Sequence, residues 1–133
     1  MYARISILLL VSLLVFTSCQ ERKADFFERE AKEFTETNCP RVMDSFTTLD
    51  SIAFKKDGEG ELRMYYTLNL NEESRSELMN KLGELGDMNL SNLRNSIELT
   101  QHREAGVSFS YIYRDAMTGE KIVEYHFTKK DYQ

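Results

Sequence analysis

One stretch of this sequence limits how the chain can fold more than any other. ELRMYYTLNL, residues 61–70, alternates between apolar and polar side chains. A strand directs successive side chains to opposite faces, so this period predicts a β-strand with one buried face. The turn sequence DGEG comes just before it, and β-branched and aromatic residues fill 41–54. The sequence therefore predicts a β-hairpin, with a bulge in the first strand where the alternation is irregular.

A second hairpin is predicted near the C-terminal end. Gly106 opens a segment, residues 107–114, in which large apolar side chains again occupy every second position. The turn sequence DAMTGE follows, and KIVEYHFT then supplies a return strand. The side chains expected to face the core from these two strands are Val107, Phe109, Tyr111, Tyr113, Val123, Tyr125 and Phe127.

Helical spacing marks the remaining segments. Residues 20–38 carry an apolar stripe made of Ala24, Phe27, Ala31 and Phe34. Asn71 is a good N-cap for a helical pair over the next segment, and Gly86 predicts a break between its two halves. In the second half, from about Asn89, the side chains expected to point inward are Leu90, Leu93 and Ile97.

These elements predict an α+β fold. Their order is N-terminal helix, β-hairpin, helical pair and β-hairpin. Two hairpins favour one four-stranded antiparallel sheet. Helices would cover one face of this sheet and leave the other partly open to solvent.

The beginning of the chain has a different character. Residues 5–16 are almost continuously apolar, and Arg4 is the only charged residue among the first 18. This run is shorter than the roughly 20 helical residues that cross a bilayer. A basic residue, a short apolar run and small residues after it predict a secretory signal peptide that is removed.

The end of this segment, Phe16-Thr17-Ser18-Cys19, resembles the lipobox of bacterial lipoproteins, with Phe16 where leucine is usual. The resemblance implies cleavage before Cys19 and attachment of lipid to its thiol. The lipid would then anchor this end of the chain in the membrane. It divides the chain into a signal peptide over 1–18, a tether over 19–23 and one domain over 24–133. Gln20 is not the Asp that retains lipoproteins at the inner membrane, which implies an outer-membrane anchor facing the periplasm. An ordinary signal peptide with an incidental cysteine is the alternative.

A looser resemblance covers much of the domain. The segments CPRVMDSFTTLDSI, RMYYTLNL, AGVSFSYIYRDAMTGE and HFTKKDY are similar to a pattern found in small exported bacterial proteins. This resemblance implies a compact α+β exported domain with no known activity. Asp50-Ser51-Ile52 also resembles a short bacterial O-glycosylation acceptor. The positions that carry the domain pattern are Pro40, Asp44, Thr47 or Thr48, Gly106, Asp115, Thr128 and Asp131.

Charge and composition narrow the functional classes. The chain has 17 basic and 22 acidic residues, for a net charge of −5, and loss of Arg4 with the signal peptide makes it −6. An acidic domain is a poor candidate for binding nucleic acid, whose phosphate backbone is bound by Lys and Arg. Two histidines and two cysteines do not form a zinc pattern, and no nucleotide or cofactor motif occurs. We therefore predict no cofactor, no metal and no nucleic-acid partner.

The best candidate surface lies on the open face of the sheet. It is a mixed polar and aromatic patch, for which a simple solvated face is the alternative. Its predicted members are Arg63, Tyr65, Ser110, Ile112, Arg114, Glu124 and His126.

The predicted function is a lipid-anchored, non-enzymatic module of the cell envelope that binds an envelope protein or a small ligand. One alternative is a small envelope enzyme that uses Cys39, His102 or His126, with Glu104 near His102 as a carboxylate. Cys39 has two interpretations: a small, buried apolar side chain or a reactive thiol. Another alternative is an immunity-type protein that neutralises a toxin through its acidic surface.

Overall fold

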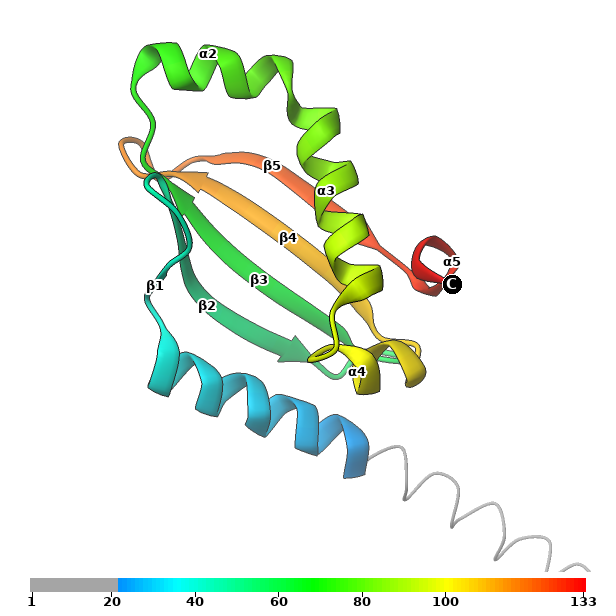
Figure 1. Ribbon diagram of the computed structural model, residues 1–133. Helices are drawn as coiled ribbons and strands as arrows, with labels where there is room; N and C mark the ends of the chain where they lie inside the picture. Colours follow the sequence, from blue (N-terminus) through cyan, green and yellow to red (C-terminus); the bar gives the residue numbers. More distant parts are fainter. Residues whose placement is uncertain (1–21) are drawn as a thin grey trace, which may run out of the picture.

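A computed structural model of the chain describes residues 22–133, and the predicted signal peptide and Cys19 lie outside this range. A helix occupies residues 22–38, at the blue end of the ribbon in Figure 1. The remaining elements are β1 (Arg41–Val42), β2 (Thr47–Lys55), β3 (Glu61–Leu68), α2 (Glu72–Asn80), α3 (Leu82–Asn95), α4 (Thr100–Glu104), β4 (Ser108–Asp115), β5 (Lys121–Phe127) and α5 (Lys129–Tyr132).

The sheet corrects the predicted topology. It has five strands in the order β1-β2-β3-β4-β5, and β3 and β4 run parallel, with Glu61 opposite Ser108 and Leu68 opposite Asp115. The other neighbouring strands are antiparallel. The prediction of four antiparallel strands was wrong because α2, α3 and α4 together form a crossover. They return the chain to the end of the sheet where β3 began, and parallel strands require such a connection.

The fifth strand arises within the segment predicted as one strand over 41–54. The side chain of Asp44 accepts hydrogen bonds from the backbone N–H groups of Phe46 and Thr47, at 3.0 and 2.8 Å. This turn folds β1 back onto β2. The predicted bulge is present, as a shift in the β2–β3 register between Leu49 and Ser51.

The N-terminal helix closes the outer edge of β2. The hydroxyl of Thr35 accepts a hydrogen bond from the N–H of Ile52 and donates one to its carbonyl, each at 2.9 Å. Phe27 on the same helix is buried against Phe54, with ring centroids 5.4 Å apart. An unpaired strand edge favours association with other chains, and this helix covers part of one.

The core lies between the helices and one face of the sheet (Figure 1). Leu62, Met64 and Leu68 of β3 point into it, as the period of two predicted. Phe109 of β4 and Leu93 of α3 are fully buried at its centre. The helices thus cover one face of the sheet, and the polar side chains of β3 and β4 occupy the other.

The helical pair breaks at a different residue from the predicted one. α2 ends at Asn80, and α3 continues without interruption through Gly86. A Cβ at Gly86 would lie 2.7 Å from Cε1 of Tyr125, so this glycine permits close approach of α3 to β5. The prediction for Ile97 was also wrong: it is 89% exposed, because α3 ends at Asn95 and the chain then leaves the helical path.

The residues of the exported-protein pattern are mostly found at turns and caps. Asp44 forms the β1–β2 turn, and Gly106 has a φ of +76°, a left-handed conformation before β4. Asp115 accepts a hydrogen bond from the N–H of Met117 at 2.9 Å. Thr128 and Asp131 form a capping box at the start of α5. The pattern therefore describes how this chain turns, and it contains no group of reactive side chains.

Candidate functional site

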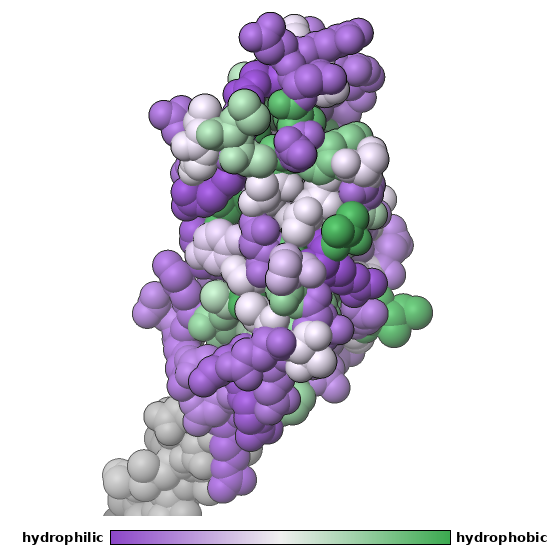
Figure 2. Space-filling model, turned by 90° about the vertical axis from the view of Figure 1, so that its left-hand side faces the viewer, coloured by the Kyte–Doolittle hydropathy of each residue, from purple (hydrophilic) through white to green (hydrophobic). Residues whose placement is uncertain are grey.

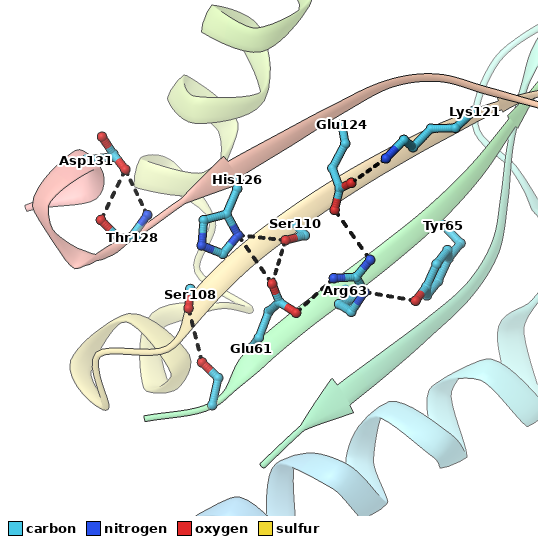
Figure 3. A network of polar contacts seen from close by, with 11 residues as sticks. Glu61, Arg63, Tyr65, Ser108, Ser110, Lys121, Glu124, His126, Thr128 and Asp131 are labelled. Atoms are coloured by element: carbon cyan, nitrogen blue, oxygen red, sulfur yellow. Dashed lines mark hydrogen bonds and ion pairs between the residues drawn. The ribbon is translucent and has the colours of Figure 1, made fainter. Parts of the chain in front are cut away.

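The open face of the sheet brings together the seven residues predicted as an interaction patch. They come from adjacent positions on β3, β4 and β5: Arg63 is opposite Ser110, which is opposite His126, and the next row contains Tyr65, Ile112 and Glu124. Figure 3 shows most of this network. Ile112 lies at its centre and is 1% exposed. Arg114 lies at one end, where its guanidinium donates to the carbonyl of Gly119.

Ser110, His126 and Glu61 form a compact triangle within this network. The Ser110 hydroxyl lies 2.8 Å from Nδ1 of His126 and donates to Glu61, also at 2.8 Å. Glu61 in turn lies 3.3 Å from the same Nδ1. Burial alone would raise the pKa of Glu61, but hydrogen bonds from Arg63 and Ser110 and the nearby positive charges outweigh it, so the pKa is lowered.

This triangle does not have the geometry of an activated nucleophile. Such a site needs an accessible hydroxyl on one imidazole nitrogen and a carboxylate on the other. Here the hydroxyl and the carboxylate share Nδ1, and Ser110 has no exposed surface. The arrangement instead satisfies polar groups on an uncovered sheet.

The remaining charges on this face also compensate one another. Arg63 lies 3.0 Å from Glu61 and 3.4 Å from Glu124, and it donates to the hydroxyl of Tyr65 at 2.9 Å. Lys121 lies 3.0 Å from Glu124. The basic groups at the centre of the face already have partners, so the network offers little unsatisfied charge to a ligand.

The three residues of the enzyme alternative occupy different surroundings. His102 is buried on the core side, where its ring stacks on Phe27 at 4.1 Å, whereas His126 lies on the open side with Ser110. Cys39 is half-buried beside Thr35, and burial raises the pKa of its thiol. Within residues 22–133, no hydrogen bond or ion pair joins any two of the three. In that range the side chains also form no cluster suited to a metal ion.

A large groove lies elsewhere, between the helical crossover and the sheet. Its volume is about 950 Å³. One wall is a row of side chains along α2, α3 and the following loop: Ser74, Leu78, Lys81, Leu85, Met88, Asn92, Ser96 and Leu99. The opposite wall and floor come from the β1–β2 turn and from the inner face of β3 and β4: Met43, Asp44, Phe46, Thr47, Met64, Tyr66, Leu68, Tyr111 and Tyr113.

The mouth of the groove is unusually apolar for a protein surface. Met43, Phe46 and Met88 line it and are 51%, 47% and 53% exposed. On the side of the molecule that carries the β1–β2 turn, Figure 2 shows apolar and weakly polar atoms interrupting a hydrophilic surface. Methionine side chains adapt to irregular partners, and apolar surface of this kind marks binding grooves.

The floor of the groove is a row of tyrosines. The ring of Tyr66 is stacked with that of Tyr113 and with that of Tyr111, at centroid distances of 4.8 and 6.4 Å. Asn89 of α3, which is also buried, donates to the hydroxyl of Tyr113 at 2.9 Å. This polar contact joins the helical wall to the floor and holds the groove at a defined width.

The rim of the groove is acidic. Its charged residues are Asp44, Glu77, Lys81 and Glu98. Lys81 lies 2.8 Å from Glu77, which neutralises both. Among the residues that the structure describes, no basic side chain forms an ion pair with Asp44 or Glu98. The groove therefore combines an apolar interior with a negative rim.

Sequence reasoning missed this groove. Tyr111 was predicted only as a core-facing residue of a strand, and an apolar residue that lines a groove gives the same signal as one in the core. The sequence analysis assigned no role to Met43, Phe46 and Met88, the exposed apolar residues at the mouth of the groove.

The fold and the groove together define a class: a small α+β domain in which a helical crossover leaves an apolar channel over one part of a mixed sheet. Within residues 22–133, no helix has the length and apolar character needed to cross a membrane. The chain belongs to the family described as a domain of unknown function, DUF8479, whose model matches residues 22–123. No curated protein sequence matches the chain.

Solved structures with this fold include exported and secretion-system proteins. A protein of Pseudomonas aeruginosa described as secreted aligns with a TM-score of 0.68 at 12% identity, over 83% of this chain and 92% of that one. The type II secretion system pilotin AspS of Vibrio cholerae aligns with a TM-score of 0.61 at 14% identity. The pilotin EpsS of Vibrio vulnificus aligns at 0.60 and 13%. Each pilotin alignment covers 87% of this chain and 97% of the pilotin. At these identities the likeness is one of fold.

Proposed function

We propose that this protein is a lipid-anchored protein of the cell envelope that acts as a non-enzymatic binding module. Its groove holds an apolar segment of another envelope protein. The observation that carries this proposal is the groove of about 950 Å³ between the helical crossover and the sheet. Ligand sites in proteins commonly have volumes of about 300–1,000 Å³ and are lined mainly by apolar side chains.

The composition of the groove supports a protein segment as its occupant. The exposed side chains at its mouth, such as Phe46 and Met88, would be removed from water by the apolar face of an amphipathic helix. The acidic rim formed with Asp44 and Glu98 favours basic residues on the flanks of that segment. The shared fold with secretion pilotins agrees with a binding role in the envelope.

The anchor proposed at Cys19 would place this groove at a membrane surface. The helix includes residue 22, so only Gln20 and Glu21 lie between it and Cys19, a distance of three chain steps. An extended chain spans at most about 3.5 Å per residue, which would hold the helix start within roughly 10 Å of the lipid attachment. We expect an outer-membrane anchor with the domain in the periplasm. Incorporation of labelled palmitate should disappear in Cys19→Ser, and a label that persists contradicts the anchor.

The groove is tested with two matched substitutions. Met88 lines the groove, whereas Met117 is exposed in the β4–β5 turn and does not line it. Met88→Asp places a charge in the apolar mouth, and Met117→Asp adds the same charge elsewhere. An envelope protein that copurifies in stoichiometric amount with the wild type and Met117→Asp should be lost from Met88→Asp. Equal recovery with both variants contradicts a role for the groove.

A further inference from the structure

One tyrosine hydroxyl on the groove floor lacks a hydrogen-bond partner. Tyr111 is 5% exposed and lines the groove, and no residue in the described range forms a hydrogen bond with its hydroxyl. The hydroxyls of other tyrosines packed in or against the core are hydrogen-bonded: Tyr113 with Asn89, Tyr125 with the carbonyl of Leu82 and Tyr132 with the carbonyl of Val107. The Tyr111 oxygen keeps some accessible surface in the groove, so an occupant that excludes water without accepting its hydrogen would leave it unpaired, at a cost of about 1–3 kcal/mol.

The hydroxyl of the neighbouring tyrosine on the floor also lacks a strong hydrogen-bond acceptor. Tyr66 is stacked on Tyr111, and its hydroxyl has only the sulfur of Met64, at 3.9 Å, as a partner. Burial raises the pKa of both phenols, so both remain protonated and able to donate at neutral pH. The floor of the apolar groove therefore presents two hydroxyl donors without strong acceptors.

The charges around the groove indicate which acceptor these donors suit. Among residues 22–133, Lys81 is the only basic residue that lines the groove, and Glu77 already pairs with it at the rim. A buried carboxylate or phosphate above the tyrosines would lack a compensating positive charge, which is costly in an apolar site. A neutral acceptor, such as an amide oxygen, carries no such penalty.

We infer that the Tyr111 hydroxyl, with Tyr66 beside it, donates a hydrogen bond to a neutral carbonyl carried by the segment that occupies the groove. The carbonyl belongs to an Asn or Gln side chain on an apolar helix face or to the main chain at a helix end, where carbonyls are unpaired. This inference rests on the proposed function of the groove. It makes Tyr111 a specificity-determining residue, because an apolar segment without a carbonyl at this point leaves the donor unsatisfied.

Three small probes of similar length test the inference on the domain comprising residues 22–133, which buries its own core. N-pentylacetamide carries a neutral acceptor, heptanoate an anion and heptylamine a cation. Binding is followed by chemical-shift changes of groove residues in NMR titrations. We expect N-pentylacetamide to bind about three- to tenfold more tightly than the other two, as one net hydrogen bond provides. Tyr111→Phe should weaken the binding of N-pentylacetamide by the same factor without altering the fold.

Tyr132→Phe is the matched control, because its hydroxyl is already paired with the carbonyl of Val107 and its side chain does not line the groove. This variant should keep the preference for the amide probe. The inference is overturned if N-pentylacetamide binds Tyr111→Phe as tightly as the wild type, or if Tyr132→Phe weakens its binding equally. If none of the probes shifts groove residues of the wild-type domain, the groove itself does not bind apolar ligands. That result overturns the proposed function together with the inference.

Discussion

Acidification should destabilise this protein through His102. Its side chain is buried in α4, stacked on Phe27 with centroids 4.1 Å apart, and its Nδ1 has no hydrogen-bond partner among the described residues. Burial lowers the pKa of this imidazole from 6.5 to about 4. Glu30 would oppose the shift, but its carboxylate is half exposed and 3.9 Å from Nε2, so solvent weakens its effect.

The direction of the effect follows from proton binding. Between pH 6.5 and pH 4, the unfolded chain binds a proton at His102 that the folded protein excludes. The free energy of unfolding therefore falls as the pH is lowered through this window and becomes constant below it. A shift of one unit corresponds to about 1.4 kcal/mol, so the full loss is roughly 3 kcal/mol, and about 2 kcal/mol of it is reached by pH 5.

Urea unfolding followed by circular dichroism at pH 7.5 and pH 5 measures this loss. His102→Phe retains an aromatic ring against Phe27 but cannot titrate. We expect the wild type to lose about 2 kcal/mol more than this variant between the two pH values. The comparison removes the contribution of the other titrating groups. Equal losses in the two proteins would show that His102 is not held neutral by burial, and the reasoning about its environment would be refuted.

The groove and its supports give further predictions. Tyr113→Phe should lower the free energy of unfolding by about 1–3 kcal/mol, because it leaves a buried amide on α3 without its partner. Tyr111→Phe removes only an unpaired hydroxyl and should leave the urea midpoint unchanged or higher. Gly86→Ala should destabilise, since overpacking against Tyr125 costs about 1–3 kcal/mol. Gly83→Ala meets no atom within 4 Å and should stabilise α3 by up to about 1 kcal/mol. Equal effects of the two alanines would contradict the close approach of α3 to β5.

Local periodicity was sufficient to predict the strands and their faces. The alternation in residues 61–70 and 107–114 placed Leu62 and Phe109 in the core and Arg63 and Ser110 on the opposite face. The relative direction of β3 and β4 could not be read in this way. It depends on the end of the sheet to which the crossover returns, and that is decided by packing between elements distant in the sequence.

The close approach of α3 to β5 explains why the break in the helical pair was predicted at the wrong residue. A glycine in a helical pattern signals either a break or contact with a neighbour. Gly86 contacts Tyr125, which is far from it in the sequence, so only the tertiary structure distinguishes the two meanings. The actual break, at Lys81, has no glycine or proline to mark it.

The candidate site was only partly accessible to sequence reasoning. The seven residues predicted on the open face do lie together, because residues two apart on a strand share a face. The hydrogen bonds and ion pairs among these residues were not predictable from the sequence. They leave little unsatisfied charge on this face for a ligand. The groove depends on the distance between α2–α3 and the sheet, which no local pattern records.

The measurement that tests the groove most directly is site-specific photocrosslinking in intact cells. A photoreactive amino acid replaces Met88 in the groove or Met117 in the β4–β5 turn, two methionines that are both exposed. We predict one discrete envelope-protein adduct from position 88 that is absent from position 117. This adduct should also disappear when Leu85, a neighbour in the groove wall, is changed to Asp. Identical adducts from both positions, or none from position 88, would contradict the account.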